Sequence, residues 1–193
     1  MNIKNYIQDS IDTKTKILND EKILNTIQAI ANEIVIGYEN GKKVLTAGNG
    51  GSAGDAQHIA GELVSKFFFD RPGLSAFSLA TDTSILTAIG NDYGYEKTFS
   101  RQVQANGCEG DIFIGISTSG NSKNIVLALE EAKKKGMITV GLVGSKSCDM
   151  DELCDYIIKV PSTSTPTIQE SHIMIAHIIC ALVEEAIFGK VGV

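Results

Sequence analysis

The sequence predicts an α/β domain with a mostly parallel central sheet and an N-terminal helical extension. Short apolar runs alternate along the chain with stretches of helical periodicity, and such alternation is typical of crossover units in parallel sheets. Turns rich in glycine or serine follow two of the apolar runs, at the strand ends where these sheets bind ligands. The 193 residues are about the size of one domain, so we expect a single domain over residues 1–193, with residues 1–40 as the extension.

The N-terminal segment, residues 3–39, is predicted to be helical because isoleucines recur at three- and four-residue steps, most clearly from Ile23 to Ile34. Asn40-Gly41 ends this helix, and residues 43–47 then form a short buried strand. The elements expected after it are a helix over 55–67, a strand over 75–80, helices from 83 and over 95–105, a strand over 111–116, a helix over 121–135, strands over 137–143 and 156–160, and a long helix from 166 to roughly 188.

Composition excludes several classes of protein. Hydrophobic residues make up 43% and charged residues 21%, an ordinary globular mixture, so disordered and collagen-like chains are excluded. A net charge of −6 without a basic stretch argues against a nucleic-acid or anionic-membrane surface. Polar residues interrupt the apolar ones at the start of the chain, and the most apolar stretch, 173–183, is short of the ~20 residues that a bilayer needs. We expect a cytoplasmic protein whose four cysteines are reduced thiols.

A serine-rich loop, Ser117-Thr-Ser-Gly-Asn-Ser122, follows the strand predicted over 111–116 and precedes a helix. Hydroxyl groups, free backbone N–H groups and the positive end of a helix dipole together bind a phosphate without cationic side chains. A single residue of this loop, Ser119 or Asn121, would be enough to cap the helix. Because the loop holds five such residues, we favour phosphate binding.

A glycine-rich loop runs from Gly48 to Gly54 after the first strand. By pattern it matches a dinucleotide fingerprint. The polar start of the next helix, with an acidic Asp55, disfavours a pyrophosphate there. We favour close backbone approach to a polyhydroxylated ligand, with Asn49 and Ser52 supplying hydrogen bonds.

Polar residues on two helices form a second candidate group. His58 and Glu62 are four residues apart and share a helix face, which suits a metal site, an acid/base pair or a surface contact. Gln169 and His177 lie on the long C-terminal helix, where His172 is at the wrong step to share a face with His177. On one continuous helix Gln169 and His177 are ~12 Å apart, too far for one zinc ion. Either the chain is not helical at Gln169, or a neighbouring subunit supplies His177.

These motifs together resemble the phosphoheptose isomerases of the sugar isomerase (SIS) domain family over nearly the whole chain. The resemblance implies a flavodoxin-like three-layer α/β sandwich, a homotetramer with active sites between subunits, and one zinc ion per subunit. It implies conversion of D-sedoheptulose 7-phosphate to D-glycero-D-manno-heptose 7-phosphate for nucleotide-activated heptose and bacterial surface polysaccharide, including lipopolysaccharide and capsule. A non-catalytic phosphosugar-binding adaptor of the same wider family is the alternative.

The resemblance also assigns roles to residues. The zinc ligands are His58, Glu62, Gln169 and His177. Glu62 is implied as the base at carbon and His177 as the acid at oxygen, because a ketose becomes an aldose through an enediol when one proton moves between C1 and C2 and another between the oxygens. The implied substrate contacts are Asn49, Gly50, Gly51, Glu62, Asn91, Asp92, Ser117, Thr118, Ser119, Ser122 and Gln169, to which the loop pattern adds Ser52.

Overall fold

A computed structural model describes residues 2–189 of the chain and begins with two helices, α1 (Ile3–Leu18) and α2 (Glu21–Glu39). The single helix predicted over 3–39 is therefore wrong at one point. The Asp20 side chain accepts hydrogen bonds from the backbone N–H groups of Lys22 and Ile23, at 3.0 and 3.2 Å, and so caps a new helix. The predicted isoleucine stripe of α2 is buried in the core.

The sheet of the described chain has five strands: β1 (Val44–Gly48), β2 (Ala76–Ser78), β3 (Ile112–Ile116), β4 (Ile138–Val143) and β5 (Tyr156–Lys159). Their order is β2-β1-β3-β4-β5 and every neighbouring pair is parallel, which confirms the predicted parallel sheet. β1 and β3 are buried along their whole length, as expected for strands covered on both faces.

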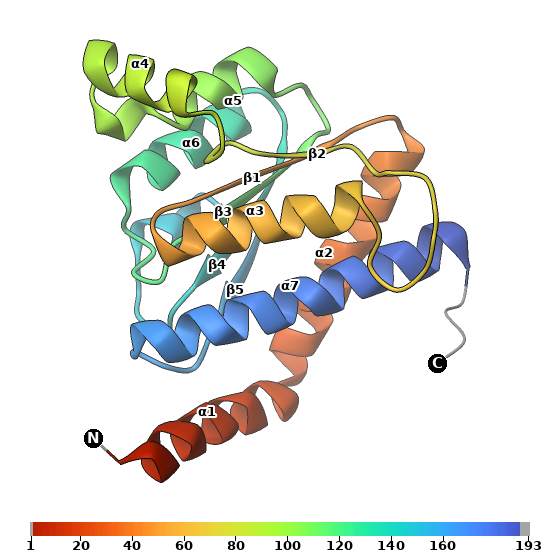
Figure 1. The fold of residues 1–193 in the computed structure, drawn as a ribbon, viewed down its shortest axis with the longest axis vertical. Helices are drawn as coiled ribbons and strands as arrows, with labels where there is room; N and C mark the ends of the chain where they lie inside the picture. The colour runs from red at the N-terminus through yellow and green to blue at the C-terminus, as the bar shows by residue number, and fades with distance from the viewer. Residues whose placement is uncertain (1, 190–193) are drawn as a thin grey trace.

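Helices cover the sheet on both faces (Figure 1). α2, α3 (Gly51–Val64) and α7 (Thr165–Phe188) pack over one face. α5 (Ser100–Asn106) and α6 (Lys123–Lys134) pack over the other, and α4 (Thr83–Tyr93) lies beside them. Two short 3₁₀ turns, η1 (Tyr95–Lys97) and η2 (Asp149–Glu152), complete the described chain.

Two predicted helix boundaries differ from the structure. The glycine loop is already helical from Gly51, because glycine at position 50 has a φ of 56° and turns the chain directly into α3. The helix predicted over 95–105 divides into η1 and α5 at Thr98. The first difference shortens the predicted glycine loop, and the second interrupts a predicted helix.

α7 is long and apolar enough to cross a membrane by length and composition alone. In the folded chain it packs against α2 and α3, and Ile175, Ile179 and Val183 belong to the core between these helices and the sheet. Its hydrophobicity is therefore explained by the core of the domain.

The strand order reverses direction between β1 and β3, so the loops after these two strands meet at the carboxyl edge of the sheet. Open α/β sheets bind ligands at this switch point. The loops in question are the predicted glycine and serine loops.

Candidate active site

The serine loop brings three hydroxyl groups together. The Ser117 and Ser122 Oγ atoms are 2.9 Å apart, and the Ser117 and Ser119 Oγ atoms are 3.4 Å apart. Ser122 is the N-cap residue of α6, yet its hydroxyl makes no capping hydrogen bond within the described structure. The hydroxyls therefore hydrogen-bond one another and leave the N–H groups of Lys123 and Asn124, at the start of α6, available to a phosphate.

A cavity of about 340 Å³ opens beside this loop. Thr118, Ser119 and Asn121 line one side of it, and the loop after β4 lines another. That second loop contributes Lys146, an exposed cation that the sequence analysis does not single out. Lys146 lies 24 residues beyond the serine motif, so only the pairing of β3 with β4 brings it to the cavity.

The glycine loop is held in place by side-chain amides. Asn49 and Asn124 exchange two hydrogen bonds of 2.9 Å each, and the Tyr95 hydroxyl donates to Asn49 Oδ1 at 2.8 Å. These contacts join the glycine loop to α6 and η1 across the switch point. Ser52 is buried at the start of α3, and the backbone at Gly48 is packed against it too closely for any side chain.

Gln169 lies against the glycine loop. A Cβ atom added at Gly51 would be 2.5 Å from Gln169 Nε2, so glycine at this position makes room for the amide. α7 is helical through Gln169 and on to His177, so the proposed non-helical start is wrong. Gln169 is thus next to the start of α3, about two turns from His58.

His58, Glu62 and His177 converge within one chain. His58 Nε2 is 2.9 Å from Glu62 Oε1 and 3.0 Å from His177 Nε2, although the two histidines are 119 residues apart in sequence. A second subunit is therefore not needed to bring His177 to the other two, contrary to the second alternative of the sequence analysis. The Phe67 ring lies against His177, with 5.6 Å between ring centroids.

The convergence suits a metal ion. One ligand atom from each of the three residues lies within 4.8 Å of the other two. Zinc holds imidazole nitrogen and carboxylate oxygen at ~2.0–2.2 Å, which places neighbouring ligand atoms roughly 3–3.5 Å apart. With both facing imidazole nitrogens unprotonated, these nitrogens and the carboxylate present three lone pairs to a common cation. The three residues thus fit a single metal ion.

Asn91 and Asp92 are exposed on α4 and hydrogen-bond each other, with Asn91 Nδ2 donating to Asp92 Oδ1 at 2.8 Å. α4 buries none of the residues that the structure describes for it, and it contacts η1, whose Tyr95 reaches the glycine loop. The structure therefore places Asn91 and Asp92 on a separate element from the histidine cluster.

His172 is a core residue, in keeping with its exclusion from the site. Its Nε2 lies 3.2 Å from the Val143 carbonyl oxygen, so this nitrogen carries the proton of a neutral ring. Burial lowers the pKa of His172 to about 4, while the bond to Val143 opposes the shift.

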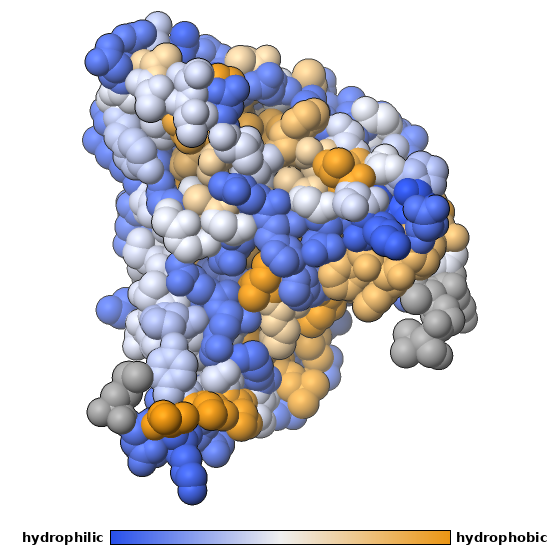
Figure 2. Space-filling view, in the orientation of Figure 1, coloured by the Kyte–Doolittle hydropathy of each residue, from blue (hydrophilic) through white to orange (hydrophobic). Residues whose placement is uncertain are grey.

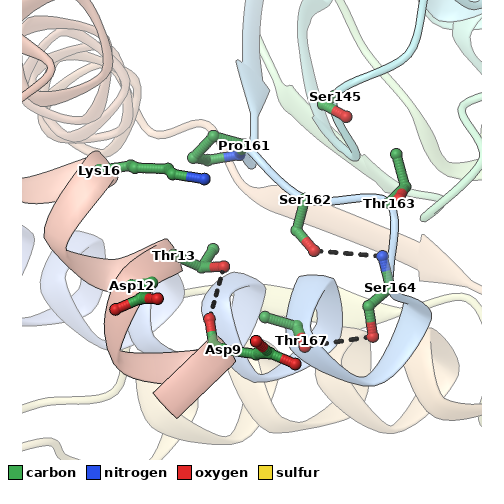
Figure 3. A pocket seen from close by; sticks show the side chains of 10 residues that line it. All are labelled: Asp9, Asp12, Thr13, Lys16, Ser145, Pro161, Ser162, Thr163, Ser164 and Thr167. Carbon is green, nitrogen blue, oxygen red and sulfur yellow. Dashed lines mark hydrogen bonds between the residues drawn. The ribbon is translucent and has the colours of Figure 1, made fainter. Parts of the chain in front are cut away.

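A second cavity of about 510 Å³ opens between α1 and the segment that leads into α7 (Figure 3). Its lining is mostly polar, and Ser145 and Ser162 also line the cavity beside the serine loop. Because its residues come from separate parts of the chain, sequence spacing carries no signal for it.

Similarity to known proteins shows the family to which this chain belongs. A family model described as the SIS domain matches residues 5–144, and the chain belongs to the SIS domain family. Within that family it is a member of the phosphoheptose isomerases. It is 67% identical over 186 residues to the phosphoheptose isomerase of Aneurinibacillus thermoaerophilus, covering 96% of this chain and 94% of the relative.

Two further relatives agree. The chain is 63% identical over 188 residues to phosphoheptose isomerase 2 of Campylobacter jejuni, covering 97% of this chain and 94% of the relative. The solved structure of a phosphoheptose isomerase from Francisella tularensis superposes with a TM-score of 0.91 at 37% identity, covering 95% of this chain and 96% of that one. The fold that the resemblance implied is thereby confirmed.

Proposed function

We propose that this protein converts D-sedoheptulose 7-phosphate into D-glycero-D-manno-heptose 7-phosphate. Membership of the phosphoheptose isomerases supports an isomerase acting on a sugar phosphate. The observation that carries the proposal is the meeting of Glu62 and His177 around His58, because ketose–aldose isomerisation needs a base and an acid at one reacting end of the sugar, roles that a carboxylate and an imidazole can fill. The product would serve the synthesis of nucleotide-activated heptose for surface polysaccharide.

Glu62 takes the proton from carbon and His177 moves the proton between the oxygens. One oxygen of Glu62 faces His58 at 2.9 Å, and the second oxygen of the carboxylate remains for the substrate carbon. His177 is half-buried beside the Phe67 ring, which shields one side of the imidazole from water. The two groups thus flank the enediol from different helices, α3 and α7.

The serine loop anchors the phosphate at the other end of the sugar. Ser117, Ser119 and Ser122 supply hydroxyl donors, and the start of α6 supplies free backbone N–H groups. Binding energy gained there holds the reacting carbons against Glu62. Asn49, Gly50, Gly51, Ser52, Asn91, Asp92, Thr118 and Gln169 complete the proposed substrate contacts.

Zinc is the proposed metal, held by His58, Glu62 and His177 with Gln169 as the fourth ligand. Imidazole and carboxylate ligands in a site that keeps room for substrate are typical of catalytic zinc. When bound, the ion would polarise the carbonyl oxygen of the sugar.

A homotetramer with active sites between subunits is also part of the proposal. Gln169 and His177 are eight residues apart on continuous α7, so Gln169 would have to reach the metal from a second copy. Exposed apolar residues lie close in sequence to members of the cluster: Val64, Phe68 and Ile178 are 50%, 56% and 40% exposed. Apolar side chains also lie along α1, at Ile3, Ile7 and Ile11 (Figure 2). Apolar surface of this extent is typical of an interface. We place the assembled enzyme in the cytoplasm.

The test is to mix the purified protein with sedoheptulose 7-phosphate and follow the aldose product, with and without a chelator. We expect turnover that falls on chelation and returns with added zinc. Sugar-phosphate binding without turnover, in the metal-loaded protein, would instead support the adaptor alternative.

A further inference from the structure

The connection between α3 and β2 crosses over α7 and is fastened there by a buried ion pair (Figure 1). Arg71 Nε lies 2.8 Å from Glu184 Oε2, and the two side chains are 2% and 0% exposed. Neither residue carries any motif in the sequence, and they are 113 residues apart. A buried pair of this kind needs a full set of hydrogen bonds to persist.

Arg71 is bonded to the end of the helix that carries Glu62. Its Nη2 donates to the Glu62 carbonyl oxygen at 2.9 Å, and its Nη1 donates to the Leu63 carbonyl oxygen at 2.7 Å. These carbonyls belong to the last turn of α3, where no intrahelical N–H is available to them. The guanidinium therefore fixes the main chain of Glu62 itself.

Glu184 is bonded to the segment that touches His177. Its two oxygens accept the backbone N–H groups of Phe67, at 2.8 Å, and Phe68, at 2.6 Å. The Phe67 ring in turn lies against the His177 ring. Glu184 is also two turns after His177 on α7, so both residues move with the same helix.

We infer that Arg71 and Glu184 are positioning residues of the reaction centre, which set the axial register of α3 against α7 and thereby the spacing of Glu62 and His58 to His177. The inference rests on the proposed function of that cluster. The pair bonds the main chain of Glu62 directly and reaches His177 through Phe67. A displacement of about 1 Å in such a site can cost ~100-fold in rate.

A matched control is present on another element, just before β3. Asp111, at the start of β3, is a buried carboxylate that accepts two backbone N–H groups, from Lys43 and Cys108, and one side-chain cation, Lys43 Nζ at 2.6 Å. Glu184 likewise accepts two backbone N–H groups and one cation. Asp111→Asn therefore tests the loss of a buried charge without touching the α3–α7 register.

The experiment compares Glu184→Gln with Asp111→Asn in the full-length protein, at a temperature where both are folded. For Glu184→Gln we expect kcat to fall ~10–100-fold with KM within about twofold, and the affinity of the metal-free protein for Zn²⁺, measured by competition with a chromophoric chelator, to fall ~10–100-fold. Asp111→Asn should leave both quantities near their wild-type values. Arg71→Lys should show the same losses of kcat and zinc affinity as Glu184→Gln, because lysine cannot make the forked set of hydrogen bonds that arginine makes.

Equal losses in Glu184→Gln and Asp111→Asn, or wild-type kcat and zinc affinity in Glu184→Gln, would overturn the inference. If Glu184→Gln does not fold, Glu184→Asp keeps the charge and retracts it by one carbon, and the same two readouts apply. Zinc affinity decides the question even if the wild type does not isomerise the sugar. A wild type that neither binds zinc nor isomerises overturns the proposed function, and the inference falls with it.

Discussion

The serine loop and the histidine cluster are built in opposite ways. Ser117, Ser119 and Ser122 lie within six consecutive residues, and local hydrogen bonds shape their loop. His58 and His177 are 119 residues apart in sequence, on α3 and α7, and only the packing of these two helices brings them together. The binding end of the site is therefore a local structure, whereas the reacting end depends on the tertiary fold.

This difference predicts that substrate affinity and turnover depend on separate groups of residues. Changes in the serine loop should alter substrate affinity and leave the chemistry intact, whereas changes in the cluster should alter turnover. The measurements below test whether substrate affinity and turnover depend on these separate groups of residues.

The largest effect is expected for Glu62→Gln. Loss of the base should lower kcat by ~10²–10⁴-fold, because general acid–base catalysis contributes about that much, while binding of a phosphorylated sugar stays measurable. Steady-state kinetics and calorimetry with the product check both parts. Glu185→Gln, an exposed change on α7, is the control. Turnover like that of the wild type would remove Glu62 as the base.

Acidification should lower the stability of the whole fold, and with it both ends of the site, through His172. This residue lies on α7 between Gln169 and His177. Its folded pKa of about 4 is below the unfolded value of 6.5, so the unfolded chain binds the proton more tightly. The stability contribution is full above pH 6.5 and is lost as the pH falls toward 4, by on the order of 3 kcal/mol. Urea unfolding across this range measures it. His172→Gln should flatten the curve, and an unchanged curve contradicts the assignment.

The double variant Ser119→Ala, Ser122→Ala should raise KM by on the order of 100-fold with little change in kcat. Each lost hydrogen bond to a charged phosphate costs on the order of 1.5 kcal/mol. Inhibition by inorganic phosphate should weaken in parallel, and Ser84→Ala on α4 serves as the control. An unchanged KM would mean that the phosphate binds elsewhere.

The smallest effect is expected for Lys146→Gln. One exposed cation beside a phosphate contributes less than about 1 kcal/mol, so KM should rise roughly threefold and become less sensitive to salt. Lys22→Gln, at the start of α2, is the matched control. A drop in kcat at unchanged KM would show that the two ends are not separable.

Much of the fold is predictable from local pattern. The five strands and the helices between them follow from apolar runs and turn residues, and the parallel order follows from their alternation. The break at Asn19 was missed because the isoleucine spacing of α1 and α2 is the same on both sides of it, whereas the cap at Asp20 is a single side chain. The sequence does not single out Lys146, because this residue is far along the chain from the serine loop that it lies beside in the structure.

Sequence pattern alone predicts the serine loop, because hydroxyls within one short turn need no distant partner to come together. That His177 meets His58 in the same chain, while Gln169 lies against Gly51, is seen only in the folded molecule. Helix periodicity fixes which face of a helix a residue occupies, but not the position of one helix along another. That register comes from core packing and from the buried pair of Arg71 and Glu184, which no spacing rule anticipates.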